Sequence, residues 1–186
     1  MAVVNNSQYK KKAIIQLILR LIGSELIGIS FAFFYVAAKT PLGVMSNIIF
    51  GFSSAACMLC LLADMCLKLG GKIKGNVTLH NEKPMPLFGM LLGVLSTLPY
   101  YVSYVVLLLA KFRVIGSFTG PFKLINAYFL PVIDSFAKGS TASADIYWPS
   151  MILFALLPLT MIAVCHFCYK ISYENIDIAK KVLYKK

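Results

Sequence analysis

The sequence predicts an all-α, polytopic membrane protein, and three observations lead to that fold class. Of its 186 residues, 59% are hydrophobic and 13% are charged, and the mean hydropathy is +0.79. Soluble domains are about half apolar, so the chain is too apolar for that class. Four apolar runs are long enough to cross a bilayer, and basic residues gather between them. We therefore expect a single membrane domain, residues 1–186, with transmembrane helices at about 13–38, 43–69, 87–110 and 148–171.

The first span, at about 13–38, would be about 39 Å long as a helix, which exceeds the ~30 Å hydrocarbon core of a bilayer. It carries Arg20 and Glu25 at depths where a charge costs about 2.5–3.5 kcal/mol. We therefore expect both side chains to face other helices or water. The plain alternative is a neutral Glu25 with one hydrogen-bond partner and an Arg20 that extends to the headgroups.

The second span, at about 43–69, is expected to form an antiparallel hairpin with the first. Lys39-Thr40-Pro41 predicts a tight turn between them, because proline disfavours helix at the residue before it. Gly70 to Pro86 combines adjacent glycines, charged residues and two prolines, which predicts a cytoplasmic loop. The third span, at about 87–110, follows it directly.

A shorter apolar stretch, at about 121–137, lies between the third and fourth spans. It is interrupted by Lys123, Asn126, Pro131 and Asp134. We expect a re-entrant or interfacial helix here, with a fifth span as the rival interpretation. Four spans place most basic residues on the inner face, whereas five would divide them almost evenly, so the positive-inside bias favours four spans with both termini in the cytoplasm.

The fourth span, at about 148–171, begins with an interfacial tryptophan, Trp148, followed by Pro149 at a position where a helix needs no N–H donor. The basic tail, 172–186, alternates apolar residues with lysines. It fits either a short helix on the inner leaflet or a solvated tail. Anionic lipids of that leaflet are the partners that its charge predicts.

The polar residues of the spans fall into two levels when depth is counted at about 1.5 Å per residue. Arg20, Asp64 and His166 share a level about 8–10 Å from the inner boundary. We expect Arg20 and Asp64 to form a buried ion pair with His166 as a third member. The alternative for Asp64 is a local pair with Lys68, one helical turn further on.

A second polar level lies about 15–20 Å deep. It contains Glu25, Thr97, Tyr100 and Thr160, with Pro99 and Pro158 beside them. Prolines free backbone carbonyls in a helix, as the discontinuous helices of transporters do around their ion sites. This level predicts either a proton or cation site around Glu25 or ordinary hydrogen bonding between helices.

Small residues recur at about every fourth position in the first three spans, which predicts faces for close helix packing. These residues are Ser24, Gly28 and Ala32, then Gly51 and Ala55, then Gly89 and Gly93. The pattern is silent on whether the partner helix belongs to this chain or to another.

The five cysteines all lie inside predicted spans, and four of them form two CxxC pairs, Cys57 with Cys60 and Cys165 with Cys168. The pairs lie at different depths, so their four sulfurs cannot easily share a metal ion. We interpret these cysteines as small apolar side chains. The sequence thus predicts no metal site, no cofactor and no disulfide framework.

Function is less constrained by the sequence than fold. No HExxH or GxSxG motif is present, and the basic residues lie between apolar runs rather than on a soluble face, so we expect neither an enzyme nor a nucleic-acid-binding protein. The first expectation is a small non-catalytic membrane subunit or accessory protein of a bacterial plasma membrane, packing against a partner or a copy of itself. The alternative is a compact proton- or cation-coupled transporter or channel that uses Glu25.

Overall fold

The computed structural model describes residues 6–80, 84–137 and 142–174. The elements in chain order are α1 (Asn6–Leu42), α2 (Val44–His80), α3 (Phe88–Lys111), α4 (Thr119–Ile125), η1 (Ala127–Phe129), α5 (Leu130–Ala137), η2 (Ser143–Asp145), α6 (Trp148–Leu156) and α7 (Leu159–Tyr173). Four helical stretches of the described residues are long and apolar enough to cross a membrane: Lys10–Leu42, Val44–Leu79, Phe88–Lys111 and Trp148–Tyr173. The helical class and the four apolar helices are confirmed, whereas the 172–186 tail lies mostly outside the described residues.

The chain reverses between α1 and α2 at a glycine, not at the predicted Lys39-Pro41 turn. α1 continues through Pro41, which occupies its last turn. Gly43 has a φ of +52°, and its N–H donates to the carbonyl of Lys39 at 3.0 Å. Glycine adopts this left-handed conformation without steric cost, and the hydrogen bond satisfies a carbonyl that the helix end leaves free.

The second helix also runs further than predicted, through Gly70 and Gly71 to His80. Gly70 is buried against α7, where a Cβ atom would lie only 2.6 Å from the carbonyl oxygen of Tyr169. The glycine therefore allows two backbones to approach closely and does not end the helix. The predicted loop from residue 70 onward is helical up to His80.

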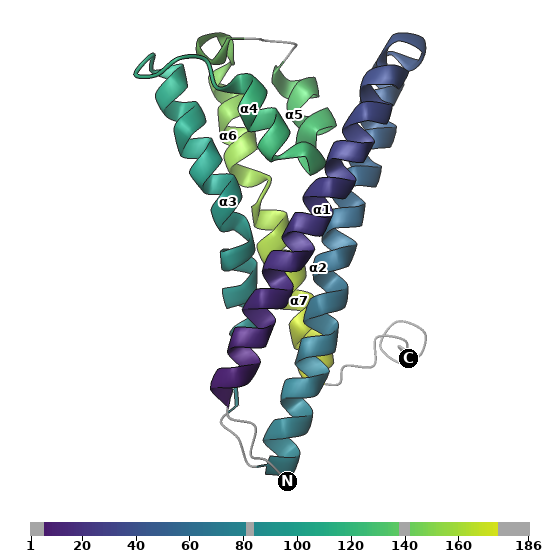
Figure 1. Cartoon of the computed structure of the whole chain (residues 1–186), viewed down its shortest axis with the longest axis vertical. Helices are drawn as coiled ribbons and strands as arrows, with labels where there is room; N and C mark the ends of the chain where they lie inside the picture. The colour runs from purple at the N-terminus through teal and green to yellow at the C-terminus, as the bar shows by residue number, and fades with distance from the viewer. Residues whose placement is uncertain (1–5, 81–83, 138–141, 175–186) are drawn as a thin grey trace, which may run out of the picture.

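The segment predicted at 121–137 forms two short helices, α4 and α5, joined by the η1 turn. In Figure 1 the α1–α2 pair and α3 diverge toward one end of the molecule, and α4 and α5 occupy the space between them. At 7 and 8 residues, each helix is about 11–12 Å long, far short of the ~30 Å hydrocarbon core. Eight of the 17 residues at 121–137 are buried, and Phe122 and Ala127 are fully enclosed.

The fourth apolar stretch is divided into α6 and α7 at Leu157-Pro158. Pro158 has no N–H to continue the helical hydrogen-bond pattern. Close to this break, the carbonyl of Ala155 accepts a hydrogen bond from the Tyr101 hydroxyl of α3 at 3.1 Å. Beyond the break, α7 packs between α2 and α3, so this helix holds together the half of the bundle that lies away from the α4–α5 segment (Figure 1).

Candidate functional site

Glu25 lies where α1 meets the η1 turn, Ala127–Phe129, which forms the tip of the α4–α5 segment. Its Oε1 atom accepts a hydrogen bond from the backbone N–H of Ala127 at 3.1 Å. One turn further along α1, a Cβ on Gly28 would lie 2.6 Å from the backbone nitrogen of Tyr128. Ser54 of α2 donates to the carbonyl of Tyr128 at 2.8 Å. The tip is therefore held by a carboxylate, a hydroxyl and a glycine contact from two long helices.

A cavity of about 230 Å³ lies beside Glu25, between α1, α3 and the tip of the α4–α5 segment. Its lining residues are Leu21, Ile22, Glu25, Ser96, Pro99, Ile125 and Tyr128. Three of these side chains carry oxygen, and the remainder of the wall is apolar. The Glu25 carboxyl group thus borders a small, largely apolar cavity.

The remaining members of the predicted mid-membrane layer do not join Glu25. Thr97 donates to the carbonyl of Val94 at 2.8 Å, and Thr160, which is exposed, donates to that of Leu157 at 2.7 Å. Each hydroxyl thus satisfies its own helix backbone, as threonine commonly does in a helix. Residue counting predicts that both residues lie at the depth of Glu25. It does not predict helix rotation, and neither side chain points toward Glu25.

Tyr100, the fourth predicted member, is fully buried among aromatic rings. Its ring centroid lies 5.7 Å from that of Phe122 and 5.9 Å from that of Phe129. Within the described residues, its hydroxyl and the Oδ1 atom of Asn126 lack hydrogen-bond partners. Tyr100 therefore belongs to the packing around α4–α5 rather than to a layer with Glu25.

A charged cluster that the sequence does not predict lies at the other end of the α4–α5 segment, away from η1. The carboxylate of Asp134 accepts hydrogen bonds from Lys123 at 2.5 Å, Lys39 at 2.6 Å and the hydroxyl of Tyr35 at 2.9 Å. Burial opposes ionisation of Asp134, but the Lys123 and Lys39 ammonium groups outweigh it and lower its pKa to about 2. The sequence shows these residues as interruptions of an apolar run, and no local spacing reveals their pairing with α1.

Arg20 and Asp64 are in contact, as their common depth suggested. The Nη2 atom of Arg20 lies 2.6 Å from Oδ2 of Asp64, and its Nη1 atom donates to the carbonyl of Leu61. Lys68 lies 2.8 Å from Asp64, so the expected pair and its local alternative coexist. The pair is partly exposed rather than buried. His166 does not join it, because its Nδ1 atom is buried without a hydrogen-bond partner among the described residues.

The small residues of the first three spans mostly pack within the chain. Gly28 and Gly51 face the α4–α5 segment, and Gly89 and Gly93 face α7, where added Cβ atoms would lie 2.3 Å and 2.7 Å from Tyr169 and Ile162. Ser24 is buried and donates to the carbonyl of Leu21 at 2.8 Å, whereas Ala32 and Ala55 are half-buried. The glycine faces are thus already occupied by this chain.

Among the described residues, a small-residue surface on α2 and α7 is not covered by another helix. α2 and α7 border an apolar hollow of about 450 Å³ that faces outward. Its lining residues are Phe52, Ala55, Ala56, Leu59, Cys60, Ala63, Val164 and Cys168. Five of them are alanine or cysteine, so another helix can approach the backbone closely here.

The five cysteines are all free thiols, and Cys66 and Cys165 are buried between α2 and α7. The described residues contain no group of three or more His, Cys, Asp or Glu side chains that could hold a metal ion. Comparisons with protein-family models, with curated proteins and with solved structures find no match for this chain. The geometry of the molecule is therefore the basis for any functional inference.

Proposed function

We propose that the protein is a small, non-catalytic membrane subunit that packs against a transmembrane helix of a partner protein. The outward-facing hollow between α2 and α7 is the observation that carries this proposal. The four glycines predicted for helix packing already contact other elements of the chain, whereas the hollow has a floor of small side chains that none of the described residues covers. Close approach to small residues is the usual basis of helix association in lipid.

The topology proposed for this subunit places the start of α1, the end of α2 and the end of α7 at the cytoplasmic face of a bacterial plasma membrane. Figure 1 shows these three ends together at one end of the molecule. The lysines at 10–12, 68–74 and 170 lie toward it, which agrees with the positive-inside bias. The α4–α5 segment then enters from the outer face and returns to it as a re-entrant hairpin buried within the protein, as such backbone must be at membrane depth.

The proposal is tested by cross-linking from the hollow. A photoreactive amino acid at Ala56 should give a stoichiometric adduct with a second membrane protein, identified by mass spectrometry after native purification in mild detergent. The same amino acid at Val102, an exposed apolar position of α3, is the matched control and should capture no protein. An adduct with a second copy of the chain would replace the partner by a homo-oligomer, and no protein adduct from Ala56 would overturn the proposal.

A second variant tests whether the hollow itself is used. Ala63→Phe fills it with a ring that has room to point outward, so the fold should be retained while copurification of the partner falls. Val102→Phe adds a similar volume to the other exposed face and should leave copurification unchanged. Equal yields of partner with the two variants would argue against the α2–α7 hollow as the contact.

One observation favours a different function, that of a compact proton- or cation-coupled transporter or channel. The cavity of about 230 Å³ places the Glu25 carboxylate next to unoccupied space at the tip of the α4–α5 segment. Intramembrane carboxylates beside such space are typical of proton and ion pathways. Glu25→Gln keeps an oxygen that can accept the Ala127 N–H, so it should fold. Proton-driven flux in liposomes that Glu25→Gln abolishes would support this function, and the absence of flux would leave the subunit proposal.

A further inference from the structure

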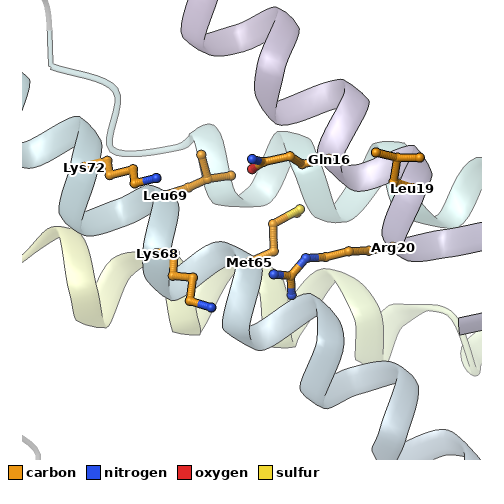
Figure 2. A pocket seen from close by; sticks show the side chains of 7 residues that line it. All are labelled: Gln16, Leu19, Arg20, Met65, Lys68, Leu69 and Lys72. Carbon is orange, nitrogen blue, oxygen red and sulfur yellow. The ribbon is translucent and has the colours of Figure 1, made fainter. Parts of the chain in front are cut away.

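A cationic pocket of about 240 Å³ lies between α1 and α2 near the cytoplasmic ends of both helices as placed above. Figure 2 shows its lining side chains, which converge from the two helices: Gln16, Leu19, Arg20, Met65, Lys68, Leu69 and Lys72. It is separate from the α2–α7 hollow and from the Glu25 cavity, since it shares no lining residue with either.

The pocket has more positive than negative charge. Asp64 accepts hydrogen bonds from both Arg20 and Lys68, so one carboxylate is shared between two cations. Lys72 has no carboxylate partner in the part of the chain that the structure describes. The Gln16 amide, on the opposite wall, likewise has no hydrogen-bond partner among those residues. Lys72 and Gln16 therefore face the same space as Arg20 and Lys68. The latter two share the carboxylate of Asp64.

The Arg20 guanidinium is held in place by its bonds to Asp64 and to the carbonyl of Leu61. These bonds occupy only part of its five N–H donors. The planar group is thus pre-oriented at the edge of the pocket with donors to spare, which is how arginine recognises phosphate oxygens.

The pocket lies at the boundary between charged and apolar surface. Gln16 is only about 6 Å along α1 from Lys12, at four residues of about 1.5 Å each. On the other side, Leu19 lines the pocket and is 63% exposed, and Ile15 and Ile18 beside it are also exposed. A ligand that fits both surfaces is an amphiphile with an anionic headgroup and an apolar chain.

The volume of the pocket agrees with a headgroup rather than a bare ion. One water molecule needs only about 10–15 Å³ of such cavity volume, so 240 Å³ has room for many more atoms than a single ion provides. A phosphate has five heavy atoms, so the space also accommodates the glycerol atoms next to it.

We propose that this pocket binds the phosphate of an anionic glycerophospholipid. Lys72 and the free donors of Arg20 contact the phosphate oxygens, Gln16 donates to the adjoining headgroup oxygens, and the acyl chains lie along the exposed apolar face of α1. Asp64 acts as a positioning residue that keeps Arg20 and Lys68 at the pocket wall. Inorganic phosphate offers the same oxyanion to these side chains. The experiment must therefore distinguish the phosphate of a lipid from free phosphate.

Native mass spectrometry of the full chain, released from micelles containing phosphatidylglycerol or phosphatidylcholine, measures the binding. We expect one phosphatidylglycerol to be retained in preference to phosphatidylcholine. Lys72→Gln should weaken its binding about fivefold, and Lys11→Gln, the same charge change at an exposed site outside the pocket, less than about twofold. Equal losses in the two variants would overturn the site in favour of general attraction to basic residues.

Two further measurements keep the outcome decisive. Gln16→Glu retains the shape of the side chain but adds a negative charge to the pocket, so it should abolish retention while thermal unfolding stays near the wild-type temperature. Inorganic phosphate added in millimolar excess should not displace phosphatidylglycerol. Displacement by phosphate alone would overturn the lipid assignment and leave an ion site.

Discussion

Asp134 and Asp64 are each flanked by two cations, yet they lie in different surroundings. Asp134, at the outer end of the bundle as oriented above, is 12% exposed and binds Lys39, Lys123 and the Tyr35 hydroxyl. Asp64, toward the inner end, is 44% exposed, and both of its cations face the pocket between α1 and α2.

The contrast indicates two roles for the same charge arrangement. The contacts of Asp134 link α1, α4 and α5, so its charges are compensated inside the protein and connect elements far apart in the sequence. The contacts of Asp64 link α1 and α2 along an open surface, where a further anion can reach the cations. Burial thus separates a cluster that stabilises the fold from one that remains available to a ligand.

Removing Asp134 should have the largest effect on stability. Asp134→Asn leaves Lys123, which is 19% exposed, without its carboxylate, and breaking a buried pair this way costs about 3–5 kcal/mol of unfolding free energy. Thermal unfolding of the purified protein in detergent measures the loss. Adding Lys123→Met should restore much of it, whereas adding Lys39→Met should restore little, because Lys39 is 51% exposed and can turn outward. Equal rescue by both changes would contradict the difference in burial.

The same cluster predicts a pH dependence. The pKa of Asp134 is lowered from 3.8 to about 2, since the Lys123 and Lys39 bonds outweigh burial. A carboxyl group whose pKa is lower in the folded state stabilises the fold above its unfolded pKa and loses this effect as the pH falls through the folded value. The stability difference between wild type and Asp134→Asn should therefore be constant above about pH 5 and shrink as the pH falls through the unfolded pKa of 3.8 and the folded pKa of about 2. A difference that already shrinks near pH 6 would contradict an ion-paired Asp134.

Adding a methyl group at Gly28 should have the next largest effect, because it acts at the tip of the segment that Asp134 holds at its other end. A Cβ there would lie 2.6 Å from the backbone of Tyr128, so Gly28→Ala must displace α4–α5 or α1. Overpacking of this kind costs about 1–3 kcal/mol. Gly23→Ala on the same helix meets nothing within 4 Å and should leave the unfolding temperature unchanged or slightly raised. Similar temperatures for the two variants would show that the tip is not in close contact.

A smaller effect on stability is expected at the α6–α7 break. It tests whether the half of the bundle that contains the α4–α5 segment also depends on hydrogen bonds between uncharged groups. Tyr101→Phe removes the donor to the carbonyl of Ala155 and should cost about 1 kcal/mol. Tyr104→Phe removes a similar bond to the carbonyl of Met151, which lies inside α6 where the helix supplies its own N–H donor. Its effect on the unfolding temperature should therefore be smaller, and the reverse order would argue against the carbonyl of Ala155 depending on the Tyr101 hydroxyl.

Hydropathy and helix rise predict the parts of this molecule that depend on position along a helix. The four apolar helices follow from run length, and Arg20 contacts Asp64, which residue counting predicts to share its level. The direction in which a side chain points depends on helix rotation, which counting does not provide. Thr97 and Thr160 therefore share a depth with Glu25 and still point elsewhere.

The contacts that hold α4 and α5 lie beyond sequence reasoning for a different reason. Asp134 and Lys39 are 95 residues apart, and their pairing depends on where the short segment folds back. Glycines were equally ambiguous, since Gly43 reverses the chain whereas Gly70 continues a helix to allow contact with α7. Only the tertiary neighbours of each glycine distinguish these uses.

Removing Asp64 should have the smallest effect, and this completes the comparison of the two carboxylates. Because Asp64 and Lys68 are substantially exposed, Asp64→Asn should lower the unfolding temperature only slightly, and far less than Asp134→Asn does, in the same detergent assay. The variant also removes the carboxylate that keeps Arg20 and Lys68 at the pocket wall, so retention of phosphatidylglycerol should fall although the unfolding temperature changes little. A destabilisation as large as that of Asp134→Asn would show that the Arg20–Asp64 pair is a structural link between α1 and α2, and the division between the two ends of the bundle would then fail.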